Sequence, residues 1–161
     1  MSSLSRVANK NAGWTLPELV VVIAVLAIVA ALAAPRSLDR DLFAARGYAV
    51  ELASAARLSR AVATASACPV QLQISTAGYI ARQPAILGTH CAAASSGFIT
   101  TVARASGGQI QGIAPASLPP IGALQWTFNA DGSVQVAGGV VAAVGPQSIT
   151  IDPATGAVAG P

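Results

Sequence analysis

Charged residues are scarce in this sequence: they make up 9% of the 161 residues, whereas hydrophobic residues make up 53%. Aromatic residues contribute only 4%. A chain with so little charge and so much apolar content is not typical of a disordered, solvated protein. Its length favours one domain plus an appendage.

Lysine is absent after Lys10, and much of the net charge of +3 comes from the first residues of the chain. Two of the nine cations, Arg6 and Lys10, precede residue 14, so residues 14–161 carry seven cations against six anions, a net charge of +1. A nucleic-acid-binding face needs several clustered cations that release counterions from phosphates. The closest pair is Arg57 and Arg60, so we do not expect nucleic acid as a partner.

Histidine occurs once, at His90, and cysteine twice, at Cys68 and Cys91. This wide spacing is not that of a zinc site, and we find neither a phosphate-binding loop nor a nucleophile elbow. We therefore expect no enzyme activity, no metal and no cofactor. In an exported chain the two cysteines favour a disulfide; the alternative is two buried free thiols.

The longest apolar stretch covers residues 19–34 and contains no charge. With residues 14–18 it makes 21 residues, about 32 Å as a helix, enough for a bilayer core. A buried helix of a soluble protein fits poorly, because no polar face remains. A cleaved secretory signal is another alternative, since Ala31-Leu32-Ala33 matches the A-x-A pattern. Against it, the stretch is long for such a signal and Glu18 stands at its start.

Pro35 follows this stretch and is expected to kink a helix, because proline lacks a backbone donor and clashes with the preceding turn. Helical periodicity then resumes up to Cys68-Pro69. We predict one long helix from about Pro17 to about Ala67, apolar all round in its first half and amphipathic in its second. The predicted apolar stripe consists of Leu38, Leu42, Ala45, Ala49, Leu52 and Ala56.

After residue 69 the pattern changes to short β-like runs separated by turns. We predict a hairpin around Thr76-Ala77, a loop at 84–97, and turns at 129–132 and 152–156, with Gly132 in a left-handed conformation. The fold class is therefore α+β: a long, kinked N-terminal helix packed on a C-terminal antiparallel β-sheet or sandwich. The predicted strands are Val70–Ser75, Gly78–Arg82, Phe98–Ala103, Gln109–Ile113, Leu124–Phe128, Ser133–Val136, Val140–Val144, Ser148–Ile151 and Ala157–Ala159.

The block from Gly13 to Glu18 lies between a basic leader and the apolar stretch. Basic residues tend to stay on the cytoplasmic side of a membrane. Cleavage after Gly13 would free an amine on Trp14 at the membrane surface, and Glu18 would lie one helical turn deeper. An acid at that depth needs a partner. The best candidate is the amine of its own chain or of a neighbour, and a neighbour's amine would set the axial register between subunits.

The segment Gly13-Trp14-Thr15-Leu16-Pro17-Glu18-Leu19 resembles the prepilin-type cleavage and methylation segment of type IV pilin-like proteins, in which phenylalanine usually stands where this chain has Trp14. The resemblance implies cleavage by a prepilin peptidase after Gly13 and N-methylation of Trp14. It also implies an assembly role for Glu18. Pro35 matches the helix-kinking proline of these proteins, 22 residues into the processed chain.

Two later segments, LQWTFNADGS at 124–133 and SITIDPATG at 148–156, resemble the GspH/FimT pseudopilins. This resemblance implies a minor pseudopilin of a type II secretion pseudopilus, with other pseudopilins or pilins as partners. The alternative is a FimT-like minor type IV pilin in pilus assembly or DNA uptake, motivated by the arginines at 57, 60, 82 and 104. DNA-receptor members carry a G-R-x-R ending, where this chain has Gly156-Ala157-Val158-Ala159.

The resemblance also implies that the chain divides into four segments. Residues 1–13 are the leader, 14–34 the transmembrane and filament-core helix, 35–67 its amphipathic continuation, and 68–161 a periplasmic β domain. The implied location is the bacterial inner membrane, crossed once. A soluble periplasmic protein released from a signal peptide is the remaining alternative.

Overall fold

A computed structural model describes residues 15–33, 40–88 and 90–161. The chain divides into two compact units, Met1–Asp39 and Arg40–Pro161. Of the predicted site residues, Gly13, Trp14 and Pro35 lie outside the described residues. The predicted junction between the two halves of the long helix also lies outside them, so the kink stays a prediction.

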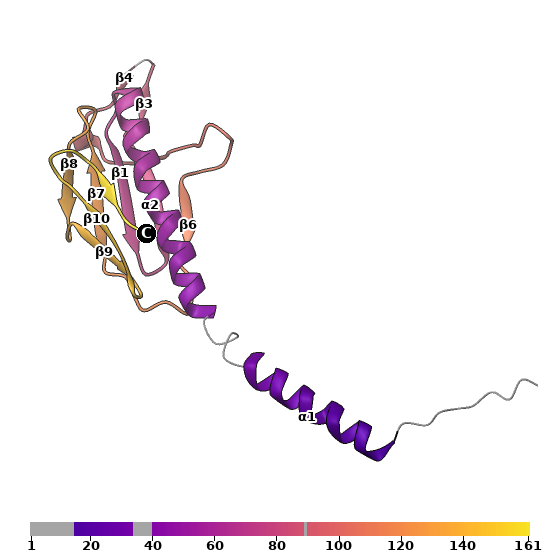
Figure 1. Ribbon diagram of the computed structural model, residues 1–161. Helices are drawn as coiled ribbons and strands as arrows, with labels where there is room; N and C mark the ends of the chain where they lie inside the picture. The colour runs from indigo at the N-terminus through magenta and orange to yellow at the C-terminus, as the bar shows by residue number, and fades with distance from the viewer. Residues whose placement is uncertain (1–14, 34–39, 89) are drawn as a thin grey trace, which may run out of the picture. The chain divides into compact units, whose positions relative to one another are not determined.

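In the first unit, helix α1 spans Leu16–Ala33 (Figure 1). It begins there because the Thr15 carbonyl accepts hydrogen bonds from the N–H groups of Glu18 and Leu19, at 3.0 and 3.2 Å. Large apolar side chains are exposed along the helix, among them Leu19, Val20, Val21, Ile23, Val25, Leu26, Ile28 and Val29.

In the part of the chain that the structure describes, no helix combines the length and the apolar character needed to cross a membrane.

In the second unit, helix α2 spans Arg40–Ser66 and buries a face rich in alanine. Small side chains there let the backbone of the helix come close to the sheets. Four of the predicted stripe residues, Ala45, Ala49, Leu52 and Ala56, are buried. Leu42 is exposed instead, because it lies in the first turn, ahead of the buried part that begins at Ala45.

Six strands form the main sheet, in the order β5-β2-β1-β7-β8, with β6 also paired to β2. All these pairs are antiparallel. The β1–β2 hairpin turns at Thr76-Ala77, as predicted. The strands are β1 (Val70–Ser75), β2 (Gly78–Gln83), β5 (Thr100–Thr101), β6 (Gln111–Ile113), β7 (Leu124–Phe128) and β8 (Val134–Ala137).

A second sheet has three strands in the order β11-β10-β9: β9 (Val141–Val144), β10 (Gln147–Ile151) and β11 (Val158–Ala159). The predicted loop at 84–97 was wrong in part. It contains the paired strands β3 (Ile86–Leu87) and β4 (His90–Cys91) and a 3-10 helix at Ala94–Ser96. Strands of two residues are too short to show a periodic pattern.

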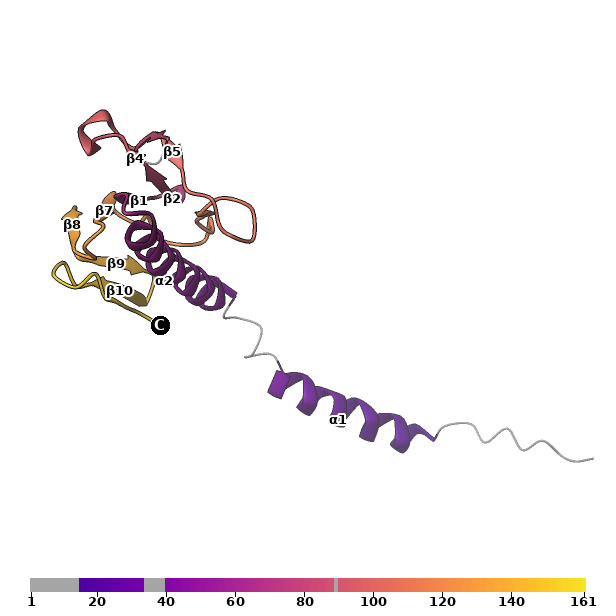
Figure 2. The ribbon, with the colours of Figure 1, turned by 90° about the horizontal axis from the view of Figure 1, so that it is seen from above.

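The buried face of α2 packs against strands of both larger sheets, which curve around one side of the helix in Figure 2. Alternation along β7 sends Trp126 and Phe128 into this core, together with Leu72 of β1 and Ile149 of β10. Gln125 and Thr127 face the other way. The structure thus confirms the α+β class, with a helix packed on antiparallel sheets.

Candidate functional site

Glu18 lies in the first turn of α1 with an exposed side chain. Thr15 directly precedes the helix, so Thr15 and Glu18 have the spacing of a capping box, in which the two residues satisfy each other's backbone donors. An acid in the first turn also interacts favourably with the helix dipole. The T-x-x-E pattern before an apolar run is the sequence signal for such a helix start.

Cys68 and Cys91 form a disulfide, with Cα atoms 5.8 Å apart. Cys68 lies between the end of α2 and β1, and Cys91 ends β4. The bond therefore fastens the β3–β4 hairpin to the end of the helix.

The two segments that resemble the GspH/FimT turns lie side by side, because the N–H of Val134 donates a 2.8 Å hydrogen bond to the Pro153 carbonyl. Each turn is held by its own aspartate. Asp131 Oδ1 accepts from the Ser133 N–H at 2.9 Å, and Asp152 Oδ1 from the Ala154 N–H at 3.0 Å.

Hydroxyl groups also donate to these two carboxylates, Ser133 to Asp131 and Thr155 to Asp152, both at 2.6 Å. The hydroxyl bonds, followed by the backbone bonds, lower the pKa of both aspartates below the ordinary value. The hydroxyl and backbone hydrogen bonds both favour the ionised form of each aspartate. The two carboxylates therefore stay charged and serve to hold the turns. They are not poised to transfer protons.

Arg60 of α2 reaches the same two turns. Gly156 has a φ of +66°, and a Cβ there would lie 3.0 Å from Arg60 Nε. Gly132 has a φ of +87°, the left-handed conformation that was predicted, and a Cβ there would lie 3.6 Å from the guanidinium. The two glycines therefore make room for the arginine beside the turns.

Tyr48, Glu51 and Tyr79 form a cluster between α2 and β2. The Tyr79 hydroxyl donates a 2.7 Å hydrogen bond to Glu51 Oε1, and the two tyrosine ring centroids are 6.0 Å apart. Burial, and then the Glu51 charge, raises the pKa of Tyr48 to about 12. Burial, and then the bond to Glu51, raises the pKa of Tyr79 as well. No local sequence pattern predicts this cluster, because Glu51 and Tyr79 are 28 positions apart in the chain.

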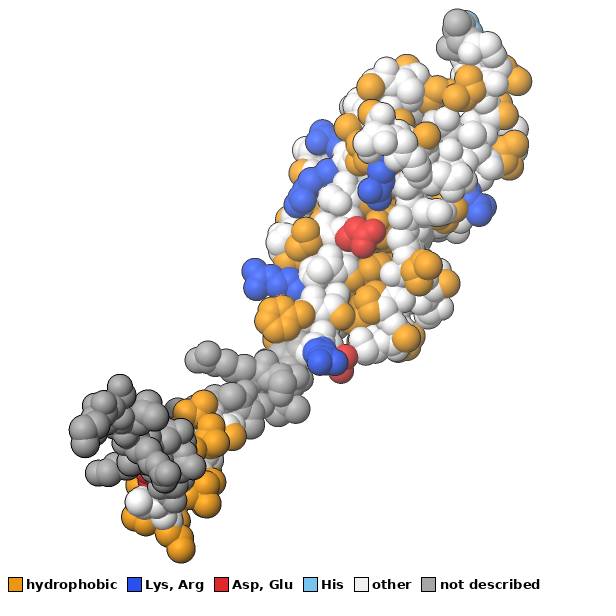
Figure 3. Space-filling view, turned by 90° about the vertical axis from the view of Figure 1, so that its right-hand side faces the viewer, with side chains coloured by type: hydrophobic (Ala, Val, Ile, Leu, Met, Phe, Trp, Pro, Cys, Tyr) orange, Lys and Arg blue, Asp and Glu red, His pale blue; other side chains and the backbone are white. Residues whose placement is uncertain are grey.

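Of the four arginines considered for DNA binding, Arg82 and Arg104 are half-buried, whereas Arg57 and Arg60 are exposed. Arg57 donates to the Val158 carbonyl at 3.3 Å, and Arg60 lies at the turns. The Nε atoms of Arg82 and Arg104 are buried. On the face that Figure 3 shows, acidic side chains lie among the cationic ones.

Within residues 15–33, 40–88 and 90–161, His, Cys, Asp and Glu side chains do not gather in groups of three that could hold a metal ion. Of the predicted site residues, Glu18, Cys68 and Cys91 lie within the described part of the chain.

Comparison with known proteins identifies a motif in the N-terminal part of the chain. No curated protein and no solved structure matches the chain. Residues 8–34, however, match the prokaryotic N-terminal methylation motif, and this range includes Gly13, Trp14 and Glu18. The N-terminal segment of this protein thus carries a prepilin-type methylation motif.

Proposed function

We propose that this protein is a minor pseudopilin, a structural subunit of a type II secretion pseudopilus. It is made as a prepilin, cut after Gly13 by a prepilin peptidase, and N-methylated on Trp14. The observation that carries the proposal is the methylation motif at residues 8–34, which runs into the apolar helix α1. Residues 14–34 anchor the protein in the inner membrane and later enter the filament core, and the β domain lies in the periplasm.

The exposed apolar surface of α1 supports this proposal. Its large side chains, Leu26 at 61% exposure for example, surround the helix. Removing one Leu, Ile or Val side chain from water contributes about 1.5–3 kcal/mol. A helix with so many such side chains is stable in an apolar medium, which the bilayer supplies before assembly and neighbouring subunits supply afterwards.

Glu18 has a specific part in this proposal. After cleavage the new amine is that of Trp14, four residues before Glu18 in the chain, and in a filament the amine of a neighbour comes within reach. Two opposite charges attract more strongly in an apolar medium than in water. Glu18 therefore selects the axial position at which one subunit joins the next.

Mass spectrometry of the membrane-extracted protein tests the processing step. We expect the chain to begin at Trp14 and to carry the mass of one additional methyl group on its amine. A chain that begins at Met1, or one cut after Ala33, would overturn the proposal.

Three variants test the assembly step. Glu18→Gln keeps a side chain that suits a capping box but removes the charge, whereas Glu18→Ala removes both. We expect both variants to be cleaved normally and to be depleted from sheared filaments. Asp41→Asn, which changes the acid in the first turn of α2, is the control and should be incorporated as well as the native chain. Normal incorporation of Glu18→Gln would show that the charge has no assembly role.

A FimT-like minor type IV pilin in pilus assembly or DNA uptake is the alternative. We rank it second, since both arginines of the G-R-x-R ending are replaced and two of the four candidate arginines, Arg82 and Arg104, are half-buried. Deleting the gene should abolish release of secreted enzymes and leave pilus retraction and transformation unchanged. A gel-shift titration that finds salt-dependent DNA binding at micromolar protein would favour the alternative.

A further inference from the structure

The outer face of the main sheet, the face turned away from α2, carries amide and hydroxyl side chains in two rows across β1, β7 and β8. Strand register aligns Gln71 with Thr127, and Thr127 with Gln135, in one row. The other row aligns Gln73 with Gln125 and Gln125 with Ala137. Neighbouring strands lie about 4.8 Å apart, so the rows present closely spaced polar groups.

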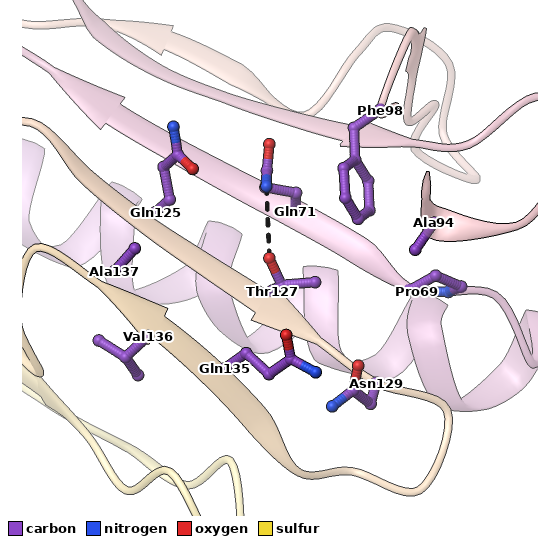
Figure 4. A pocket seen from close by; sticks show the side chains of 10 residues that line it. All are labelled: Pro69, Gln71, Ala94, Phe98, Gln125, Thr127, Asn129, Gln135, Val136 and Ala137. Atoms are coloured by element: carbon purple, nitrogen blue, oxygen red, sulfur yellow. Dashed lines mark hydrogen bonds between the residues drawn. The ribbon is translucent and has the colours of Figure 1, made fainter. Parts of the chain in front are cut away.

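A groove lies over these rows. One hollow of about 380 Å³ has Gln71, Gln125, Thr127 and Gln135 on its floor and Phe98 on its wall. Figure 4 shows the Phe98 ring directed toward the groove, with Ala94 and Pro69 nearby. A second hollow of about 360 Å³ shares Gln125 and Ala137 with the first, so the groove continues along the sheet. Volumes of this size are common for small-molecule sites.

The polar groups of the floor are only partly engaged with one another. Gln73 Nε2 donates to Gln71 Oε1 at 2.7 Å, and Gln71 Nε2 donates to Thr127 Oγ1 at 3.4 Å, a long bond. Gln125 and Gln135 are exposed. Each amide offers two donors and a carbonyl acceptor, which suits hydroxyl groups because a hydroxyl both donates and accepts.

The lining disfavours two other classes of ligand, an anionic polymer and an added peptide strand. Among the described residues, no Asp, Glu, Lys, Arg or His lines either hollow, so an anionic polymer finds no cation there to bind. Strand β1 is paired on both sides, with β2 and β7, and β7 is paired with β1 and β8. An incoming peptide strand would therefore find no unpaired backbone on β1 or β7, the two central strands of the floor, and an unpaired strand edge is where β-addition gains its affinity.

We propose that this groove binds an uncharged carbohydrate chain. A sugar ring lies against the Phe98 ring, and its hydroxyl groups bond to Gln71, Gln125 and Gln135. The uncharged, amide-rich lining complements an uncharged, hydroxyl-rich ligand. This binding does not depend on prepilin processing or on the secretion machine that the protein serves.

Saturation-transfer NMR on the full chain in phosphatidylcholine nanodiscs, without sugar detergents, tests the proposal. The probes are chitotetraose, maltotetraose and cellotetraose, with a heparin tetrasaccharide as the anionic counterpart. We expect saturable binding of at least one neutral probe with a Kd of about 1 mM or tighter. Gln125→Ala and Gln135→Ala, at exposed positions, should each weaken it about threefold to tenfold. Phe98→Ala should weaken binding more than either glutamine variant does.

Gln111→Ala, an exposed glutamine of β6 outside both hollows, is the matched control and should bind like the native chain. The proposal is overturned if none of the neutral probes binds up to about 10 mM, or if heparin alone binds. It is also overturned if binding survives Gln125→Ala and Gln135→Ala unchanged, since the sugar would then bind elsewhere.

Discussion

The hydroxyl of Tyr79 donates a 2.7 Å hydrogen bond to the carboxylate of Glu51 and so joins β2 to α2. Its neighbour Tyr48 differs: among the described residues, its buried hydroxyl has no hydrogen-bond partner. The ring centroids of the two tyrosines lie 6.0 Å apart. Their hydroxyl groups nevertheless affect stability in opposite ways, because only the Tyr79 hydroxyl has a hydrogen-bond partner among the described residues.

Replacing each tyrosine by phenylalanine should therefore have opposite effects on stability. Tyr79→Phe should lower the free energy of unfolding by about 1.5–3 kcal/mol, the contribution of a hydrogen bond to a charged group. Tyr48→Phe should leave it unchanged or raise it, because an unsatisfied buried hydroxyl is removed. Urea unfolding of both variants checks this. Equal losses would mean that the Glu51 bond contributes nothing specific.

Gly112 faces the same cluster. A Cβ at Gly112 would lie 2.5 Å from Tyr79 Cε1 and 2.8 Å from Glu51 Oε1, so Gly112→Ala should destabilise the protein by about 1–3 kcal/mol through overpacking. Gly47→Ala is the control, since its Cβ would meet nothing within 4 Å on helix α2. It should stabilise the protein by about 0.5–1 kcal/mol, because alanine favours the helix. Thermal unfolding of the two variants should shift in opposite directions.

The turn at Gly156 offers a second matched pair. Gly156 and Gly88 have nearly the same φ, +66° and +64°, but only Gly156 is crowded by Arg60 and by the Gly132 carbonyl. Both alanine variants carry the backbone penalty of about 1–2 kcal/mol. Gly156→Ala should lose at least about 1 kcal/mol more through overpacking. Equal losses in denaturant unfolding would show that the arginine and the turns move apart easily.

Alkaline pH should destabilise the protein in a defined window. The folded pKa of Tyr48 is about 12 and that of Tyr79 is also raised, whereas an unfolded tyrosine has a pKa near 10.0. The folded state thus holds its protons more tightly, so this stabilisation is full below pH 10 and is lost as the pH rises toward 12. The chain has two tyrosines, so its phenolate absorbance reports on both directly. A native-state titration near pH 10 would contradict the prediction.

Removing the disulfide should lower the free energy of unfolding, mainly because the unfolded chain gains conformational entropy. Cys68 and Cys91 are 23 positions apart, and closing a loop of this size contributes about 3 kcal/mol in the chain-entropy model. The double variant Cys68→Ala/Cys91→Ala should unfold at lower urea concentration, and a reductant should shift the native protein but not the variant. An unchanged unfolding midpoint in the variant would contradict this.

Regular strands were predictable because alternation is a local property. Strands β1 and β7 begin and end where the period-two pattern places them, since burial on one face selects every second residue. The β3–β4 hairpin was not predictable, because its two-residue strands have no period and Cys91 draws the segment toward the end of α2. Leu42 was placed in the core wrongly, because a helical stripe does not reveal where the opposing sheet ends.

The methylation motif at residues 8–34, the apolar helix α1 and the aspartate turns follow from the sequence by itself. Each depends on residues that are near neighbours in the chain, whose spacing sets the local chemistry. Only the tertiary structure decided that Tyr79 meets Glu51, that Arg60 reaches two turns, and that glutamines of three strands share one uncharged groove. These depend on how α2 and the sheets pack, and packing brings together residues between which the chain shows no periodic relation.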